Sequence, residues 1–338
     1  MNPIRLRPNQ PADRPYRGGA GIVALRGEGS LDRHTPEDFV ASTTTCHGTD
    51  TIGLTVLPDG RTLRDAVQAE PVAWLGAEHV ERFGADTGVL VKLLHTGERL
   101  FNHVHPDGAF AQRHLDSSRG KTEAWLIADT GDSPTGTVWL GWRRDVGQDE
   151  LADWFERQDV TAQLDALHEI TVQAGDSLYV PAGTPHSIGE GITIVEVQEP
   201  TDLSIILEYA PFPALSRETA LLGLDVNTAL AAVPTGAVTS ERLAELHRRP
   251  SQGARVSLLP PEADGFFRAE RLTVAGSATI EPGFAVLVVL EGTGRLRWGA
   301  GELELTRGTT IVTPHGAGAL DIEGDVRVIR CAPPLPSA

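Results

Sequence analysis

The sequence predicts a mainly β fold with helical segments, and both its composition and its apolar pattern point to this class. The chain has 36 glycines and 23 prolines among 338 residues, which is typical of short strands joined by tight turns. Apolar residues make up 40% of the chain, enough for an ample core in as many as two domains. The longest apolar run, residues 284–290, has the length of a strand and is far too short to cross a bilayer.

Two histidine-containing motifs carry the prediction of a site. The first, residues 97–105, reads Gly, five residues and His-x-His, and the second, residues 175–186, reads Gly, five residues and Pro-x-Gly-x-x-His. Alternate side chains of a strand lie on one face, so His103 and His105 are expected to point together into a barrel. The Pro-x-Gly turn is expected to bring His186 back over the same face.

These histidines predict a metal centre. Imidazole nitrogens commonly bind zinc, iron, copper and nickel, and a further ligand is expected to be an acid. Glu123, in the stretch Lys121-Thr122-Glu123-Ala124-Trp125, is the best candidate. The sequence therefore predicts one divalent metal ion held by His103, His105, Glu123 and His186. The two motifs in this order are the signatures of the cupin barrel (a double-stranded β-helix or jelly roll), which the chain resembles.

The elements before the second motif are predicted in order along the chain. Asp38–Thr45 looks like a strand that ends in hydroxyl groups. Ser42 within it is a candidate contact for a polar ligand, and an edge strand with a solvated face is the equally supported alternative. The apolar spacing over Thr62–Phe83 predicts one or two helices interrupted by Pro71. Strands are predicted next at residues 89–94 and 99–105.

An insertion separates the two motifs, and its pattern changes twice. Residues 106–120 are polar and predicted to form a loop, whereas Leu151, Trp154 and Phe155 have the spacing of a helix within residues 148–168. Strands are predicted at residues 123–128, 137–142, 170–172, 177–180 and 193–198. A helical segment is expected at residues 214–250.

The short strands after residue 250 predict a second, eroded barrel. Residues 308–319 repeat the turn of the second motif, but Ala319 stands where the histidine should be, and Val-Leu-Glu at 289–291 replaces His-x-His. This barrel is expected to bind no metal, with His315 in a structural role. The predicted domains are a metal-binding cupin with helical insertions (1–213), a helical connection (214–255) and a metal-free cupin (256–338).

Charge and cysteine content limit the classes of partner and compartment. The formal net charge of −17 argues against nucleic acid and against an anionic membrane surface as partners. The two cysteines, Cys46 and Cys331, do not make a disulfide framework, and the N-terminal residues lack the apolar core of a signal peptide. A cytoplasmic protein that acts on a small molecule is therefore expected.

The basic residues single out two positions. Only Lys92 and Lys121 are lysines among 29 basic residues, and both lie near the metal motifs. A base-composition bias explains most of the arginine excess, but lysine differs from arginine because its pKa shifts readily on burial. We therefore expect Lys121 to be functional. Lys92 is a candidate for substrate binding, with one exposed position on a strand as the alternative.

The chain resembles the type I mannose-6-phosphate isomerases, particularly the short bacterial form. The resemblance covers nearly the whole chain and is carried by the stretches Leu90–Leu94, Val104–Asp107, Gly120–Trp125, Ala174–Asp176, Val180–His186 and Glu196–Asp202. It implies a zinc-dependent aldose–ketose isomerase with a catalytic cupin, a helical segment and a second cupin.

The resemblance also assigns residues, and the chain departs from the family at two of them. The implied metal ligands are His105, Glu123 and His186, and Lys121 matches an active-site lysine. The family's fourth ligand is usually glutamine, and His103 takes that position here. Ile206 stands at the position of an active-site arginine implicated in proton transfer, so the substrate is expected to change or mannose 6-phosphate to be a poor substrate.

The chemistry of isomerisation explains why these residue types are needed. The reaction removes a proton next to a carbonyl and returns it to the neighbouring carbon through an enediolate, whose oxygens a divalent metal stabilises. An acid–base group of tuned pKa must lie near the carbon. Lys121, two residues from Glu123, is predicted to face the metal. Glu208, two residues from Ile206, is a speculative replacement acid–base group or else an exposed strand residue.

The sequence is compatible with three functions. The first is a sugar isomerase that converts mannose 6-phosphate to fructose 6-phosphate or acts on a related sugar. The second is a non-catalytic or altered-specificity sugar-binding relative, and the third is an iron dioxygenase, since three histidines and a glutamate also bind iron in oxygenase cupins.

Overall fold

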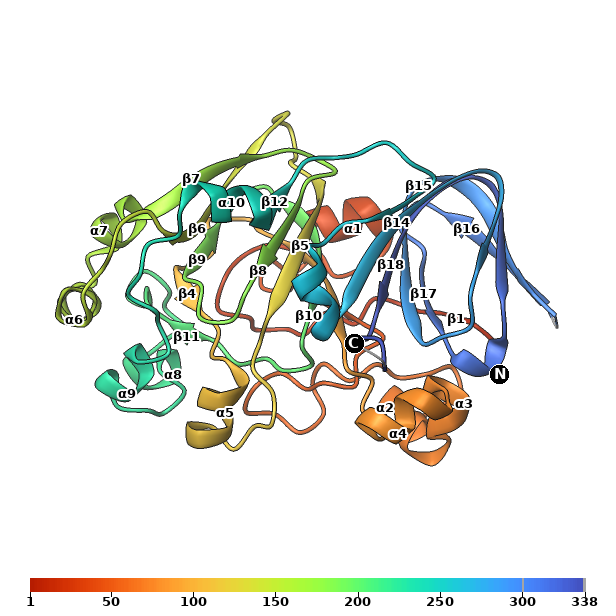
Figure 1. Ribbon diagram of the computed structural model, residues 1–338, viewed down its shortest axis with the longest axis horizontal. Helices are drawn as coiled ribbons and strands as arrows, with labels where there is room; N and C mark the ends of the chain where they lie inside the picture. The colour runs from red at the N-terminus through yellow and green to blue at the C-terminus, as the bar shows by residue number, and fades with distance from the viewer. Residues whose placement is uncertain (300, 337–338) are drawn as a thin grey trace.

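The computed structural model describes residues 1–299 and 301–336, and within them the protein is mainly β, as predicted (Figure 1). The strands form three antiparallel sheets. The first, of six strands in the order β12-β8-β5-β10-β3-β2, contains β2 (Glu37–Val40), β3 (Leu90–His95), β5 (Glu123–Asp129), β8 (Ser177–Val180), β10 (Thr193–Gln198) and β12 (His247–Arg248). The second, in the order β11-β4-β9-β6-β7, contains β4 (His103–Val104), β6 (Gly136–Trp142), β7 (Leu167–Val172), β9 (His186–Ile188) and β11 (Ile205–Ile206).

The third sheet is built from the C-terminal part of the chain and from its first strand. Its order is β1-β17-β15-β18-β14-β13, with β16 paired to β15. The strands are β1 (Ile4–Arg5), β13 (Arg255–Ser257), β14 (Arg268–Ile280), β15 (Ala285–Trp298), β16 (Gly301–Thr306), β17 (Thr310–Thr313) and β18 (Leu320–Ala332). Ile4 of β1 pairs with Val312 of β17, so two segments that are far apart in the sequence lie side by side in this sheet (Figure 1).

Burial on both faces distinguishes the central strands of the first sheet. All six residues of β10 are buried, and so are the first five of β3 and of β5, its two neighbours. Strands covered on both faces favour continuous β-branched and aliphatic runs, and the sequence Thr-Ile-Val-Glu-Val-Gln of β10 has this character except at Glu196 and Gln198. A charged side chain in such a strand requires a compensating partner, which makes Glu196 notable.

The helices are short and more numerous than predicted. The region expected to hold one or two helices contains α2 (Leu63–Ala69), α3 (Pro71–Leu75) and α4 (Ala77–Phe83). Pro71 begins α3, where its missing N–H costs nothing, and Gly76 separates α3 from α4 with a φ of 90°. The other helices are α1 (Ala20–Arg26), α5 (Gly108–His114), α6 (Gln148–Arg157), α7 (Val160–Asp165), α8 (Arg217–Ala220), α9 (Val226–Leu230) and α10 (Ser240–Leu246).

Two local predictions were wrong, each for a physical reason. The polar stretch 106–120, expected to be a loop, contains α5, because the Asp107 side chain accepts a hydrogen bond from the backbone N–H of Phe110 and caps the helix. The strand expected over Asp38–Thr45 ends at Val40, because Ala41 turns the chain with a φ of 51°.

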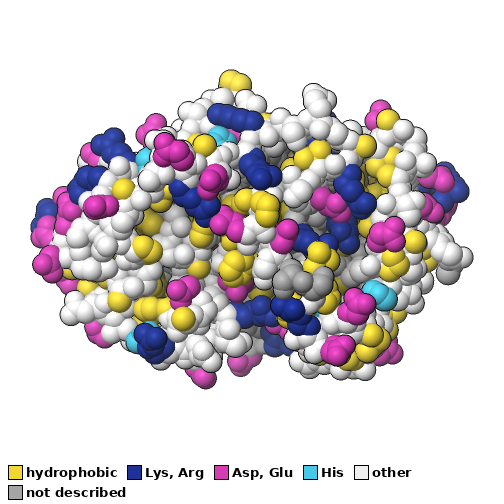
Figure 2. Space-filling view, viewed as in Figure 1, with side chains coloured by type: hydrophobic (Ala, Val, Ile, Leu, Met, Phe, Trp, Pro, Cys, Tyr) yellow, Lys and Arg dark blue, Asp and Glu magenta, His cyan; other side chains and the backbone are white. Residues whose placement is uncertain are grey.

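One continuous apolar core joins the first sheet to the third. It contains Ile194 and Val195 of β10 together with Val288 of β15 and Ile329 of β18. A separate cluster, which includes Leu272, Val289 and Val328, covers the opposite face of the third sheet. Acidic and basic side chains are interspersed over the visible surface (Figure 2). Among the described residues, no helix is both long and apolar enough to cross a membrane.

A buried ion pair fixes α1 against β2, and it generates a first prediction. Arg26 Nη1 lies 2.6 Å from Asp38 Oδ2, and the two side chains are 1% and 0% exposed. We expect Arg26→Leu to lower the free energy of unfolding by about 3–5 kcal/mol, because it leaves a buried carboxylate without its cation. Urea unfolding at pH 7 measures the loss. The double variant Arg26→Leu, Asp38→Asn should lose less than the single variant, and an equal or larger loss would contradict the explanation.

Candidate metal centre and its pocket

Three buried histidines meet at the ends of β4 and β9. His103 and His186 are paired residues of these neighbouring strands, and His105 follows β4 directly. One nitrogen of each ring lies within 4.8 Å of the other two, and the residues are 5%, 2% and 0% exposed in the order His103, His105 and His186. The alternation of side chains in the His-x-His stretch thus places both of its rings on one side, as predicted.

Backbone carbonyl groups fix the orientation of all three rings. His103 Nδ1 lies 2.9 Å from Phe101 O, His105 Nδ1 lies 2.8 Å from Leu203 O, and His186 Nδ1 lies 2.7 Å from Thr184 O. A carbonyl oxygen only accepts hydrogen bonds, so each Nδ1 carries the proton and each Nε2 keeps its lone pair. The buried Nε2 of His186 has no hydrogen-bond partner among the described residues. This tautomer is the one that a histidine ligated to metal through Nε2 requires.

Glu123 of β5 adds a carboxylate to the three rings. Its Oε2 lies 3.0 Å from His105 Nε2, and its Oε1 lies 3.4 Å from His186 Nε2. The indole N–H of Trp125 donates to Oε1 at 2.7 Å and so holds the carboxylate in place. Three imidazole nitrogens and one carboxylate oxygen form a donor set that suits zinc and other divalent transition metals. The residues present therefore fit such an ion.

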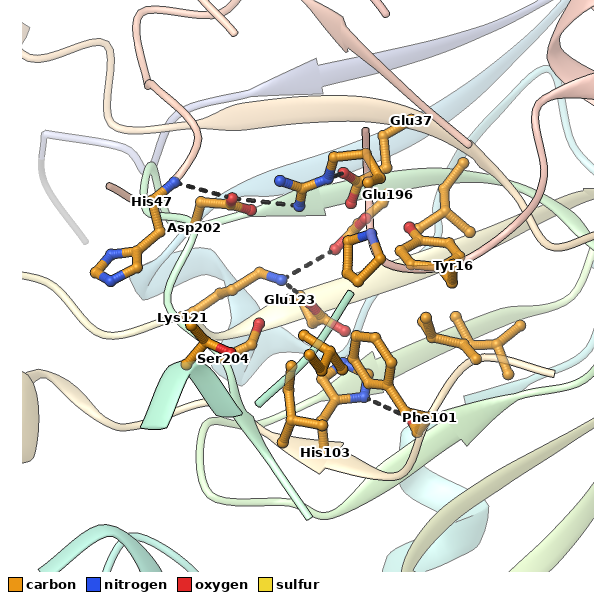
Figure 3. A pocket seen from close by; sticks show the side chains of 18 of the residues that line it. Tyr16, Glu37, His47, Phe101, His103, Lys121, Glu123, Glu196, Asp202 and Ser204 are labelled. Atoms are coloured by element: carbon orange, nitrogen blue, oxygen red, sulfur yellow. Dashed lines mark hydrogen bonds and ion pairs between the residues drawn. The ribbon is translucent and has the colours of Figure 1, made fainter. Parts of the chain in front are cut away.

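Lys121 lies against this donor set. Its Nζ is 3.0 Å from His105 Nε2, 3.1 Å from Glu123 Oε2 and 3.6 Å from Glu196 Oε1. Figure 3 shows the lysine extending between Glu196 and Glu123, above His103. An ammonium group at the edge of a donor set is placed to contact an oxygen of a bound molecule.

Burial sets the protonation of the ligand groups. It lowers the pKa of all three histidines, and that of His186 falls to about 3, so the rings are neutral near pH 7. Burial alone would raise the pKa of Glu123, but opposing interactions, led by the charge of Lys121, hold that pKa well below its usual range. The pKa of Glu196 rises to about 8, because the side chain is buried and Glu123 lies nearby.

The site opens into a cavity of about 180 Å³ with a mixed wall. Its polar lining includes Arg14, Glu37, Lys121, Glu196, Asp202 and Ser204. Its apolar lining includes Leu94, Phe101, Ile188 and Ile206. Ile206 belongs to β11 and pairs with His103 of β4, so an apolar side chain lies beside the first ligand strand. Polar groups clustered in a cavity with apolar walls are typical of sites for small molecules.

Four charges form a network at one wall of this cavity. Asp202 Oδ1 lies 3.0 Å from Lys92 Nζ, and Asp202 Oδ2 lies 3.3 Å from Arg14 Nη2. Glu37 Oε2 lies 2.5 Å from Arg14 Nε, and Glu37 Oε1 lies 3.4 Å from Lys92 Nζ. The Lys92 side chain is 1% exposed and that of Arg14 is 19% exposed, so Arg14 is the cation of the network that lines the cavity, together with Glu37 and Asp202. Two carboxylates balance two cations.

These mutual charges keep all four groups ionised. Burial would lower the pKa of Lys92, but Asp202 and Glu37 outweigh it and raise that pKa. Burial would raise the pKa of Asp202 and of Glu37, and the neighbouring cations lower both instead. The network is therefore a fixed, neutral arrangement rather than a group that titrates near pH 7.

Comparison with known proteins agrees with the site. A family model described as the cupin domain of mannose-6-phosphate isomerase matches residues 261–333. A mannose-6-phosphate isomerase of Streptococcus mutans is 27% identical over 77% of this chain and 79% of its own length. A second, from Bacillus subtilis, is 27% identical over 74% of this chain and 78% of its own length.

The predicted resemblance to the mannose-6-phosphate isomerase family is confirmed. The crystal structure of a mannose 6-phosphate isomerase from Bacillus subtilis superposes with a TM-score of 0.76, at 22% identity over 98% of this chain and 99% of that chain. A putative mannosephosphate isomerase from Archaeoglobus fulgidus gives 0.74, at 19% identity over 98% of both chains. These two likenesses show that this chain shares the fold of both proteins.

Of the residues predicted from the sequence, the structure brings five together and places three elsewhere. His103, His105, Lys121, Glu123 and His186 meet in one place. The Ser42 hydroxyl donates to Thr44 O at 2.8 Å and accepts from Thr44 N–H, away from the cavity. Lys92 lies behind the cavity wall, where its ammonium is paired with Asp202.

Glu208 is engaged in a structural contact. Its carboxylate pairs with both terminal nitrogens of Arg99 and accepts from the backbone N–H of Asn102 at 2.9 Å. The side chain is 1% exposed and does not line the cavity. Asn102 immediately precedes His103, so the bond from its N–H to Glu208 holds the start of β4 in place.

Sequence inspection missed Arg14, Glu37, Glu196 and Asp202 as parts of the cavity wall. Glu196 carried a usable signal, because it is a charged residue in an otherwise apolar strand. Lys92 has the same property, and the two are paired residues of β10 and β3. Arg14 and Glu37 carry no such signal, because long-range packing of the N-terminal segment places them there.

The contact of Glu208 generates a second prediction. Glu208→Gln removes the charge-assisted bond to Arg99, and we expect the free energy of unfolding to fall by about 1–3 kcal/mol. Arg99→Ala should cost a similar amount, and the double variant should lose little more than either single variant, because both remove the same interaction. Urea unfolding of the three variants measures this coupling. An unchanged stability of Glu208→Gln would show that the carboxylate has another role.

Proposed function

We propose that this protein is a metal-dependent aldose–ketose isomerase that acts on mannose 6-phosphate or a related sugar. The observation that carries the proposal is the set of three Nδ1-protonated, buried histidines that converges with Glu123 beside Lys121. The names of the relatives support the reaction class, since those of Streptococcus mutans and Bacillus subtilis are mannose-6-phosphate isomerases.

The proposed metal ligands are His103, His105, Glu123 and His186, and zinc is the best-fitting ion. Lewis-acid polarisation of the sugar carbonyl is the chemistry that such an ion supplies in an aldose–ketose isomerase. His103 replaces the glutamine usual in the family, and a neutral imidazole is an adequate substitute for an amide oxygen toward zinc. The cavity beside these residues leaves room for a sugar.

The proton transfer is assigned to the polar groups next to the ligands. Isomerisation takes a proton from C2 of the aldose and returns one to C1, so a group must hold the proton between the two steps. Lys121 Nζ is proposed either to take this proton as the neutral amine or, as the ammonium, to neutralise the charge on the neighbouring oxygen. Glu196, with a pKa of about 8, holds a proton near neutral pH and lies 3.6 Å from Nζ, where it can exchange that proton with the lysine.

Arg14 is proposed to contact the anionic part of the substrate. Ile206 lines the cavity at the position where the family has an arginine, and it offers no donor. Arg14 lines the same cavity, and its Nη1 forms no hydrogen bond with any described residue. A guanidinium held by Glu37 and Asp202 is pre-organised to donate to phosphate oxygens.

The proposed organisation assigns the chemistry to the N-terminal part of the chain. We propose a catalytic cupin over residues 1–213, a helical connection over 214–255 and a metal-free cupin over 256–338. The absence of a second histidine cluster among the described residues supports this, because the group of His103, His105 and His186 is the one arrangement of its kind there. Ala319, Val289 and Leu290 have no ligating side chain, and the carboxylate of Glu291 pairs with Arg327.

The sugar isomerase is favoured over the other two functions. No relative or solved structure described here carries a dioxygenase name, and no feature of the pocket requires iron. A sugar-binding relative without turnover would keep the same ligands and differ only in the absence of product, which makes an activity measurement decisive.

The metal assignment gives a third prediction. We expect one tightly bound divalent ion per chain, and loss of that ion in the double variant His105→Ala, His186→Ala, because two of its four ligands are removed. Elemental analysis of the purified proteins measures the ion. His315→Ala, in the turn between β17 and β18, is the control and should keep one ion. Full occupancy in the double variant would contradict the site, and two ions in the wild type would contradict a metal-free second unit.

The replacement of the arginine by Ile206 gives a fourth prediction. Loss of one cation from a transition-state site costs about 10²–10³ in rate, so we expect the zinc-loaded protein to convert mannose 6-phosphate slowly or to prefer another aldose. NMR of a panel of free and phosphorylated aldoses detects the ketose that forms. Turnover of mannose 6-phosphate at about 10 per second or faster would show that the missing arginine is unimportant.

The variant Arg14→Gln tests whether Arg14 binds the phosphate, separately from the effect of the arginine that Ile206 replaces. It should raise KM for phosphorylated aldoses by about tenfold or more and leave free aldoses little changed, because Arg14 is proposed to bind the phosphate. Equal effects on free and phosphorylated sugars would remove Arg14 from that role and leave the isomerase proposal intact.

A further inference from the structure

One end of the third sheet departs from the apolar pattern of its inner face. Leu272 of β14 and Val328 of β18 belong to the apolar cluster on this face. Alternate residues of a strand share a face, so the same face continues through Glu270 and Arg268 of β14 and through Arg330 of β18. Three charged side chains therefore end a face that is otherwise apolar.

These side chains line a second cavity. Its volume is about 780 Å³, and it is bounded by the end of the sheet, by residues 75–79 at the junction of α3 and α4, and by residues 333–336. Figure 1 shows α3 and α4 beside this end of the C-terminal strands. No residue lines both this cavity and the cavity of the histidines. Ligand sites commonly lie where the inner face of a curved sheet opens to solvent.

Three guanidinium groups and four carboxylates line this cavity, but among the described residues only one of these carboxylates, Glu270, forms ion pairs. Glu270 pairs with two arginines: Arg330 Nη1 lies 2.8 Å from its Oε1, and Arg255 Nε lies 2.9 Å from its Oε2. Arg268 has no carboxylate within 4.0 Å among the described residues, and its Nε donates to Pro333 O at 3.0 Å. Three guanidinium groups thus share one paired carboxylate. The carboxylates of Glu78, Asp264 and Glu281 also line the cavity, and none of them forms an ion pair with Arg268 or Arg330.

Both Arg268 and Arg330 have N–H groups that donate to no described residue, and both side chains are at least partly buried. Arg330 is 9% exposed, and its buried Nε has no hydrogen-bond partner among the described residues. Arg268 is half-buried, and both of its terminal nitrogens lack a described partner. Burial and the charge of Arg330 lower the pKa of Arg268, and the smaller opposing effects of Glu270 and Asp264 do not outweigh them. A buried donor without an acceptor, beside an unpaired cation, is unfavourable unless a ligand completes it.

We propose that this cavity is an anion-binding site for a phosphate group, held between Arg268 and Arg330. A tetrahedral phosphate presents several oxygens to the fork-shaped donors of two guanidinium groups, whereas a carboxylate presents two oxygens in one plane. The phosphate is either free inorganic phosphate or the phosphate group of a small monoester. The site does not depend on the proposed isomerase activity, because it shares no residue with the metal pocket.

Isothermal titration calorimetry of the full-length, zinc-loaded protein at low ionic strength tests the site with three probes. Inorganic phosphate and glycerol 3-phosphate distinguish the free ion from a monoester, and acetate tests the preference for phosphate over carboxylate. We expect saturable binding of at least one phosphate probe and weaker binding of acetate. No binding of either phosphate probe at millimolar concentration, or acetate bound as tightly as both, would overturn the proposal.

Matched arginine variants locate the binding. Arg268→Ala should weaken phosphate binding by about tenfold or more, since a hydrogen bond to a charged group is lost. Arg297→Ala, on the same sheet but exposed and paired with Glu302 and Glu323, should bind as the wild type does. Equal affinity of Arg268→Ala and the wild type would place the phosphate elsewhere, including the metal pocket, and would overturn the assignment.

Thermal unfolding checks that the variant is folded and adds an independent readout. Phosphate should raise the melting temperature of the wild type more than that of Arg268→Ala. Without phosphate, Arg268→Ala should melt at or above the wild-type temperature, because it removes a cation that has no carboxylate partner. A large drop in melting temperature without phosphate would show that Arg268 is already satisfied within the fold, and would contradict the proposal.

Discussion

The contact on which the site depends is the hydrogen bond from each histidine Nδ1 to a backbone carbonyl. The three carbonyls belong to Phe101, Leu203 and Thr184, which lie in three separate stretches of the chain. Backbone groups are held by the fold itself, so each ring orientation is inherited from strand and turn geometry rather than from another flexible side chain. The convergence of the Nε2 atoms is therefore a property of how β4, β9 and β11 lie together.

The charged groups around these rings stabilise one another. Four ionised groups, Arg14, Glu37, Lys92 and Asp202, are packed at one wall of the cavity, and each needs the others because buried charges are costly alone. This arrangement lets a chain with a net charge of −17 keep a pocket wall that is locally neutral. A pocket of this kind selects ligands by the geometry of its donors more than by long-range attraction.

The sequence was sufficient to predict the centre of the site but not its surroundings. His103, His105 and His186 are fixed by strand alternation and by a tight turn, which are local properties that short motifs encode. Arg14 reaches the cavity only because of long-range packing, and no local pattern carries that information. The cap that forms α5 shows a further limit, since one hydrogen bond to the Asp107 side chain converts a polar stretch from loop to helix.

The pairing of β1 with β17 bears on the order in which the protein is made and folded. Ile4 leaves the ribosome about 300 residues before its partner Val312. During synthesis, β1 has no partner for its backbone groups until β17 has emerged. Closure of the third sheet is thus coupled to the synthesis of β17, and a product that ends before β17 would leave the edge of this sheet open.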